Sequence, residues 1–268
     1  MGSDAERREL RSGFDRHARA YQRTRPVLPE QAFDDLARLA GLVPGARVLE
    51  IGCGTGQATL PLAERGVTVT AVELGPRLAA IARRRLAAFP SARVLVTSFE
   101  DFEAAGSVFD AVVAVSSLHW VDPGQRYARP FALLAPGGAM AVAGCRWARP
   151  ADVGQFWTDV QEDYRAVGYA GGPPPPAEQI GPWRFPPEAA PFFVQTAAMR
   201  YPFEVGYSSA DYLAILASQS TTRALGEAAS ADFLARVRRR LASSGWPRLT
   251  IRYVGFVTVG RRREQGQH

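Results

Sequence analysis

The chain has 268 residues, 47% of them hydrophobic, which suffices to bury one core with an inserted lid and makes two separate large domains an unfavourable interpretation. No apolar run approaches the roughly 20 residues of a membrane span, the charged first residues do not form a signal peptide, and two cysteines do not make a disulfide framework, so we expect a soluble, cytoplasmic protein. The net charge is +6 and every strongly basic residue is arginine, a bias more typical of a GC-rich bacterial genome than of a nucleic-acid or membrane partner.

From residue 46 onward, short apolar strands alternate with amphipathic helices, the pattern of a parallel sheet covered by helices on both faces. Pro76 suits the first position of a helix, whereas Pro130 should kink or split the helix that contains it. Strands are expected at 46–51, 67–72, 93–97, 109–115 and 138–144, and helices at 57–65, 76–89 and 123–134.

The pattern changes after Cys145. Proline-rich stretches at 171–176 and 182–191 should break any regular element, and aromatic residues are frequent there, so we interpret 146–191 as an inserted lid. Beyond the lid, a strand is expected at 192–203, helices at 209–217 and 231–243, and a final antiparallel strand at 249–259. The expected division is an N-terminal helical segment at 1–45 that covers the site, an α/β core at 46–145 and 192–260, the lid, and a flexible basic tail at 261–268.

A glycine-rich turn follows the first strand directly, at Gly52, Gly54 and Gly56. Such a turn lets a ligand approach the backbone where a Cβ atom would collide. Dinucleotide-binding proteins usually have G-x-G-x-x-G and place a pyrophosphate there, but this spacing is one residue shorter, and Glu50 ends the strand. A carboxylate at that point would repel a phosphate and suits an ammonium or sulfonium group, so the charges favour a cationic cofactor.

A second carboxylate, Glu73, closes the second strand about twenty residues after Gly52. It can accept hydrogen bonds from both hydroxyls of a ribose, a role that serves either kind of cofactor. The alternative is a charge that stabilises the helix N-terminus ahead of Pro76.

The stretch Glu50-Ile51-Gly52-Cys53-Gly54-Thr55-Gly56 resembles motif I of class I, Rossmann-like methyltransferases that use S-adenosyl-L-methionine. Glu73 matches their acidic residue after the second strand, and 109–110 and 134–138 resemble their later motifs. Phe14-Asp15-x-x-Ala18-x-x-Tyr21 and the segment 117–122 further resemble the small-molecule branch that includes trans-aconitate-type methyltransferases. The resemblance implies a Rossmann-like sheet of seven mostly parallel strands with an antiparallel last strand, S-adenosyl-L-methionine as cofactor, a small-molecule methyl acceptor, and a monomer or homodimer.

Many members of that family have an Asp near the end of the third strand that meets the adenine amino group, and here Ser98 takes its place. Either Ser98 or Glu100 could accept that hydrogen bond, while Phe99 contacts the base. The residues that the motifs and the resemblance together assign to the cofactor are Tyr21, Arg25, Glu50, Gly52, Cys53, Gly54, Gly56, Glu73, Leu74, Ser98, Phe99, Glu100 and Ser116.

A sulfonium already activates its methyl group, so the protein has to align donor and acceptor and exclude water, and we expect no metal. An acceptor that must lose a proton would need a base, for which His119 is the candidate; alternatively His119 only shapes the pocket. A carboxylate acceptor would instead need a cation such as Arg146 or Arg184. The expected substrate-binding residues are His17, Trp120, Arg146, Trp147 and Trp183.

Two rival functions stay open. A nicotinamide-dependent oxidoreductase is disfavoured by Glu50, by the glycine spacing and by the absence of lysine, which rules out a Tyr-x-x-x-Lys pair. A non-catalytic cofactor-binding or nucleic-acid-associated module would require the arginine runs at 83–85, 238–240 and 261–263 to form one surface, whereas solvated helix faces and tail are the simpler interpretation.

Overall fold

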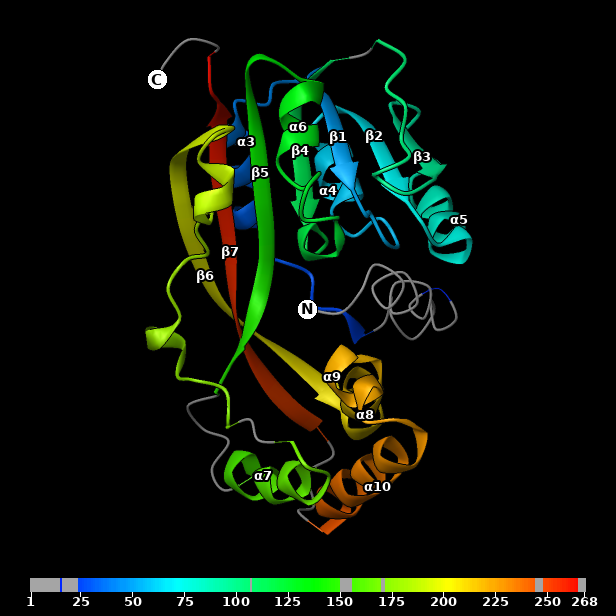
Figure 1. The fold of residues 1–268 in the computed structure, drawn as a ribbon. Coiled ribbons are helices and arrows are strands. Elements are labelled where there is room, and N and C mark those ends of the chain that lie inside the picture. The colour runs from blue at the N-terminus through cyan, green and yellow to red at the C-terminus, as the bar shows by residue number, and fades with distance from the viewer. Residues whose placement is uncertain are drawn as a thin grey trace.

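The computed structural model describes residue 15 and residues 24–106, 108–149, 156–169, 172–243 and 248–264. Within these ranges, seven strands form a single sheet in the order β3-β2-β1-β4-β5-β7-β6. The strands β1 to β5 are parallel, and β7 lies antiparallel between β5 and β6, which confirms the predicted fold class (Figure 1). The strands are β1 Arg47–Ile51, β2 Thr68–Glu73, β3 Ala92–Val96, β4 Phe109–Val115, β5 Leu134–Ala148, β6 Phe193–Ser208 and β7 Arg248–Arg262.

Helices cover both faces of this sheet. Neighbouring residues of a strand point to opposite faces, so each face packs its own set of side chains against the helices that cover it. Val48 of β1 packs into the cluster beneath α3, α4 and α5, whereas the next residue, Leu49, packs into the cluster on the other face with α6 and the aromatic residues around Trp183. Both faces of the parallel strands are therefore buried, which explains their nearly continuous apolar sequences. The helices are α3 Glu30–Ala40, α4 Thr59–Glu64, α5 Pro76–Arg85 and α6 Ala128–Leu133.

A third hydrophobic cluster lies at the far ends of the three longest strands, β5, β6 and β7. There the helices α7, α8, α9 and α10 gather beside the ends of β6 and β7, and we call this assembly the helical lobe. Figure 1 shows the two bodies joined by the long strands. The boundaries between the parts of the chain thus differ from the predicted ones, because residues 192–260 contribute both to the sheet body and to the helical lobe. The helices are α7 Phe156–Ala166, α8 Ser209–Ser218, α9 Ser220–Ala224 and α10 Glu227–Ser243.

Two predictions about local structure were wrong. The helix expected at 123–134 begins only at Ala128, so Pro130 lies in its first turn, where a missing N–H breaks no hydrogen bond and causes no kink. The lid was expected to lack regular structure, but β5 continues to Ala148 and α7 forms after it. That helix exists because Phe156 and Trp157 bury their rings against Tyr212 of α8.

The sequence analysis expected the arginine runs to be solvated, but several of these side chains donate hydrogen bonds to the main chain. Arg261 and Arg262 belong to β7 rather than to a tail, and their side chains donate to the carbonyl oxygens of Leu39 at 3.0 Å and Phe131 at 3.1 Å. Arg83 of α5 likewise donates to the carbonyl of Val94 at 2.8 Å. These guanidinium groups hold main-chain oxygens at the ends and edges of elements.

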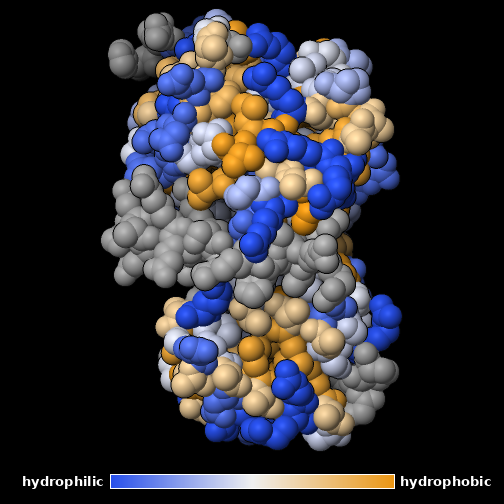
Figure 2. All heavy atoms as spheres, turned by 90° about the vertical axis from the view of Figure 1, so that its right-hand side faces the viewer, coloured by the Kyte–Doolittle hydropathy of each residue, from blue (hydrophilic) through white to orange (hydrophobic). Residues whose placement is uncertain are grey.

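Hydrophilic and apolar residues are interspersed on the face drawn in Figure 2, in the sheet body as well as in the helical lobe. Strongly hydrophilic residues are not gathered over one part of that face. Among the described residues, no helix is both long and apolar enough to cross a bilayer.

Candidate cofactor and acceptor site

A cavity of about 450 Å³ lies at the carboxyl ends of β1, β2, β4 and β5, where the sheet body meets the helical lobe. Its volume is typical of small-ligand sites. In sheets of this kind, ligands bind at the carboxyl edge beside the point where the strand order reverses, and β1 and β4 flank that point here. The predicted glycine turn forms one wall of this cavity.

The turn needs its glycines for two reasons. Gly52, Gly54 and Gly56 have φ angles of +66°, +58° and +78°, a region that other residues rarely adopt. At Gly52 there is also no room for a side chain, because a Cβ atom would lie 2.8 Å from the Cβ of Ser117. Ser117 in turn donates its hydroxyl to the carbonyl of Ile51, so the ends of β1 and β4 are fastened together behind the turn.

Glu73 is fixed at the cavity wall by two backbone amides. The N–H of Gly54 donates to Oε2 at 2.8 Å, and the N–H of Gly75 donates to Oε1 at 2.7 Å. A carboxylate oxygen can accept more than one hydrogen bond. The position and orientation fit the predicted contact with the two hydroxyls of a ribose.

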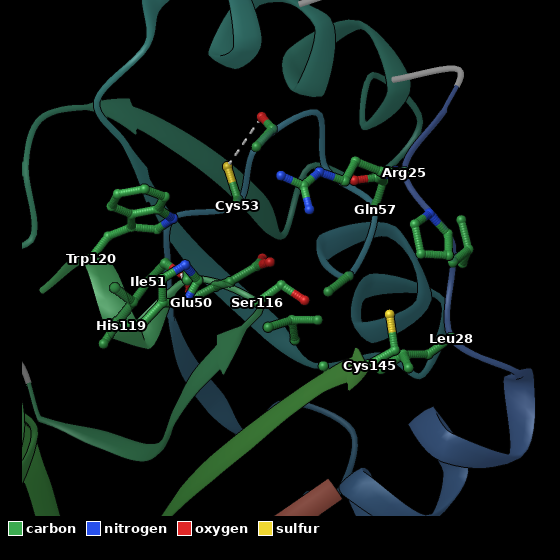
Figure 3. A pocket seen from close by; sticks show the side chains of 18 of the residues that line it. Arg25, Leu28, Glu50, Ile51, Cys53, Gln57, Ser116, His119, Trp120 and Cys145 are labelled. Carbon is green, nitrogen blue, oxygen red and sulfur yellow. Dashed lines mark hydrogen bonds between the residues drawn. The ribbon is translucent and has the colours of Figure 1, made fainter. Parts of the chain in front are cut away.

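Glu50 differs from Glu73, because no backbone N–H group in the described part of the chain donates a hydrogen bond to its buried Oε2 atom. The side chain is 1% exposed, and among the described residues no group donates a hydrogen bond to Oε2. Burial raises the pKa of Glu50 to about 7; the nearby Thr59 hydroxyl partly opposes this rise and the negative charge of Glu73 adds to it. In Figure 3, Glu50, Ser116 and Arg25 point into the same cavity. An unsatisfied buried carboxylate at this wall suits a cationic ligand group.

The segment after β3 contributes differently from the prediction. Phe99 is buried and lines the cavity, and so does Thr97, which the sequence analysis did not identify. Ser98 and Glu100 do not line it: Ser98 Oγ donates to Asp101 Oδ2 at 2.6 Å, and Glu100 Oε1 accepts the N–H of Asp122 at 3.0 Å. A contact between either side chain and an adenine stays a prediction, and the geometry favours Thr97 and Phe99 at that wall.

His119 and Trp120 lie in a 3-10 turn, Leu118–Trp120, that follows β4. Their rings are 4.8 Å apart and both line the cavity. The His119 side chain is exposed to solvent. Partial desolvation by the surrounding protein, with the charges of Arg25 and Arg126, lowers its pKa to about 4. His119 is therefore neutral at pH 7 but a weak base.

The opposite end of the cavity is aromatic. Arg146 and Trp147 extend from β5, and Trp183 stacks on Phe256 of β7 with ring centres 6.0 Å apart. Arg184 lies outside the lining, and two predicted residues, His17 and Tyr21, lie outside the described part of the chain. The sequence analysis missed the lining residues that return from distant segments, which include Ile215, Ser218, Gln219, Tyr253 and Phe256.

Of the predicted residues, the cavity brings together Arg25, Glu50, Gly52, Cys53, Gly54, Glu73, Leu74, Phe99, Ser116, His119, Trp120, Arg146, Trp147 and Trp183. Gly56 shapes the turn without lining the cavity itself. Ser116 has a φ of +56°, an uncommon value for a residue with a side chain, at the point where β4 leaves the sheet. Strained residues of this kind cluster at functional sites.

The fold is a Rossmann-like α/β sheet with a cavity at its switch point, and comparisons with known proteins find similarity to methyltransferases. A family model described as a methyltransferase domain matches residues 48–138, which run from β1 to the start of β5. A solved structure of a proposed type II methyltransferase from Anaeromyxobacter dehalogenans has the same fold, with a TM-score of 0.61 at 23% identity over 89% of this chain and 97% of that one.

Curated relatives match part of the chain. An uncharacterized methyltransferase of Mycobacterium tuberculosis is 35% identical over 138 residues, which are 51% of this chain and 53% of the relative. A demethylmenaquinone methyltransferase of Tropheryma whipplei is 34% identical over 147 residues, 53% of this chain and 60% of the relative. The chain thus spans little more than half the length of these relatives.

Proposed function

We propose that this protein is a methyltransferase that uses S-adenosyl-L-methionine and transfers the methyl group to a small-molecule acceptor. The observation that carries the proposal is the buried Glu50 carboxylate beside the glycine turn, whose Oε2 has no hydrogen-bond donor among the described residues. The match of residues 48–138 to a methyltransferase domain supports it. The bound cofactor would supply a methyl group already activated for in-line displacement.

The residues at the glycine end of the cavity would hold this cofactor. The open space beside the turn at Gly52 and Gly54 admits it, Glu73 accepts the ribose hydroxyls, and Phe99 with Thr97 borders the base. Glu50 meets the ammonium or sulfonium group, directly or through water. Cys53 and Leu74 contribute apolar wall beside these groups.

At the other end, the chain would hold the acceptor and exclude water. Trp120, Trp147 and Trp183 provide apolar surface around the path of transfer. His119 is neutral at pH 7, so it can share a hydrogen bond with an acceptor, but its low pKa disfavours full removal of a proton from a weakly acidic hydroxyl. The likeness to trans-aconitate-type enzymes rests on the sequence segments alone and stays a prediction.

The rival nicotinamide-dependent function is disfavoured by the same carboxylate. A pyrophosphate at the turn would approach Glu50 and Glu73, which lie close enough for the charge of Glu73 to raise the pKa of Glu50. Two acidic side chains at the wall oppose two phosphate charges and attract a cation.

Calorimetric titration of the full chain with S-adenosyl-L-methionine, S-adenosyl-L-homocysteine and NAD tests the proposal. We expect the first two to bind and NAD not to bind. Glu73→Ala should weaken both by about tenfold or more, because it removes a charged acceptor of the ribose hydroxyls. Glu64→Ala, an exposed carboxylate at the end of α4, is the matched control and should leave both affinities unchanged. Binding of NAD without binding of S-adenosyl-L-methionine would overturn the proposal.

A further inference from the structure

Charged side chains of both signs line the cavity. Among its described lining residues, the only carboxylates are Glu50 and Glu73, beside the glycine turn, and the only cations are Arg25 and Arg146. Arg146 extends from the end of β5, next to Trp147 and near the helical lobe. A ligand in this cavity therefore meets negative charge at the turn and positive charge toward the lobe.

Arg25 is the second cation of the described cavity lining. Its positive charge contributes to the lowered pKa of His119, and it partly offsets the burial that raises the pKa values of Cys145 and Tyr253. Figure 3 shows Arg25 directed into the cavity from the segment before Pro26.

Arg146 forms one end of an aromatic stack. Its guanidinium carbon lies 6.0 Å from the ring centre of Phe256, and the Phe256 ring stacks on Trp183 with 23° between the planes. No carboxylate of the described chain forms an ion pair with Arg146. The stack thus offers a flat apolar surface that ends in a cation available to a ligand.

We infer that the acceptor is an anion with a flat apolar body, bound on the Trp183–Phe256 surface with its negative group toward Arg146. The inference rests on the proposed function, because it assigns the glycine end to the cofactor. Planar apolar surface binds the body, and the guanidinium group of Arg146 can form charge-assisted hydrogen bonds to a carboxylate or phosphate oxygen. Arg146 and Phe256 are then specificity-determining residues.

Three probes that share one ring system test this inference: 2-naphthoate, 2-naphthyl phosphate and the neutral 2-naphthamide. Each is titrated into the full chain with and without saturating S-adenosyl-L-homocysteine, and binding is followed by tryptophan fluorescence. We expect at least one anionic probe to bind about tenfold or more tightly than the amide. The stronger of the two anions identifies the headgroup as carboxylate or phosphate. Equal affinities for all three probes would overturn the inference.

Variants assign the discrimination to its residues. Arg146→Gln should abolish the preference for anions, whereas Arg146→Lys should keep part of it, which separates loss of charge from loss of folding. The matched control is Arg149→Gln, an exposed arginine three positions further that does not line the cavity, and it should keep the preference. Phe256→Leu should weaken all three probes alike.

An equal loss of preference in Arg149→Gln and Arg146→Gln would contradict the assignment. The titrations without S-adenosyl-L-homocysteine distinguish failure of the proposed function from failure of the proposed anion site. If the probes discriminate by charge but no S-adenosyl compound binds, the proposed function fails and the anion site stands. If the S-adenosyl compounds bind and the probes do not discriminate, only the inference fails.

Discussion

Glu50 and Glu73 are both carboxylates beside the same turn, yet their surroundings give them different properties. Glu73 accepts two backbone N–H groups at 2.7 and 2.8 Å, which stabilise its charge. Glu50 Oε2 has no donor among the described residues, and burial raises the pKa of this residue to about 7. A buried ionised carboxylate without hydrogen-bond donors lowers the stability of the folded chain, and a bound cation would stabilise it.

The folded chain holds the Glu50 proton more tightly than the unfolded chain does. As pH rises above 4.5, the ordinary pKa of the group, the unfolded chain ionises first, so stability falls until pH passes about 7. We predict that Glu50→Gln removes this loss. Its stability advantage over the wild type should grow by about 2.5 kcal/mol between pH 5 and pH 8, measured by urea unfolding without ligand. Parallel pH profiles for the two proteins would refute the raised pKa.

We predict that ligand affinity rises with pH over the range in which stability falls. Because the ionised form attracts a cation, wild-type affinity for S-adenosyl-L-methionine should rise about eightfold from pH 6 to pH 7.5, and Glu50→Gln should bind weakly at both. The same titrations with S-adenosyl-L-homocysteine locate the contact. A matching rise indicates the ammonium group, and a rise for the methylated form alone indicates the sulfonium.

At the scale of elements, the turn between β1 and α4 combines two constraints at one residue. Gly52 needs a positive φ, and it also faces the Cβ of Ser117, whose hydroxyl fastens Ile51. Gly45, by contrast, has a φ of +86°, and no atom lies within 4 Å of the place that a Cβ atom would take there. Substitution of Gly45 therefore tests backbone strain alone, whereas substitution of Gly52 tests strain together with steric overlap.

We predict that Gly45→Ala lowers the free energy of unfolding by about 1 kcal/mol, the cost of a left-handed backbone for a residue with a Cβ atom. Gly52→Ala should cost about 3 kcal/mol, because overlap adds to that strain. Denaturant unfolding measures both. Ser117→Gly in the Gly52→Ala background should recover part of the difference, since it removes the opposing Cβ atom. Equal losses at the two positions would show that the overlap relaxes freely.

At the scale of the whole molecule, the helical lobe is a separate hydrophobic cluster attached through β5, β6 and β7. Its helices α7 and α10 are joined by Arg240, which donates to both carboxylate oxygens of Asp163, at 2.7 and 3.2 Å. Asp163 is 6% exposed, so removing its partner costs more than breaking a surface ion pair does. The lobe also supplies Ile215, Ser218 and Gln219 to the cavity wall.

We predict that Arg240→Ala destabilises the lobe by about 3 kcal/mol, because it leaves a buried carboxylate without its partner. Hydrogen exchange should accelerate in α7 and α10 and stay unchanged in the strands β1 to β4. Arg236→Ala on the same helix removes an exposed pair with Asp232 and should cost less than about 1 kcal/mol. Exchange that accelerates equally in both bodies would show that they unfold as one unit.

The sequence by itself determined the parallel half of the sheet and the glycine end of the cavity. Each depends on local chemistry: apolar runs buried on both faces, glycines at positive φ, and carboxylates such as Glu50 and Glu73 at strand ends that meet at one edge of the sheet. Periodicity and turn residues carry that information within a few neighbouring positions.

Only the tertiary structure decided the acceptor end and the helical lobe. The lengths of β5, β6 and β7 come from their pairing with one another, and α7 forms because distant rings on α8 cover it. Phe256 reaches the cavity because β7 returns antiparallel beside β5 and brings it opposite Gly144. Such contacts join residues far apart in the chain, so local patterns predict the elements but not which of their side chains meet.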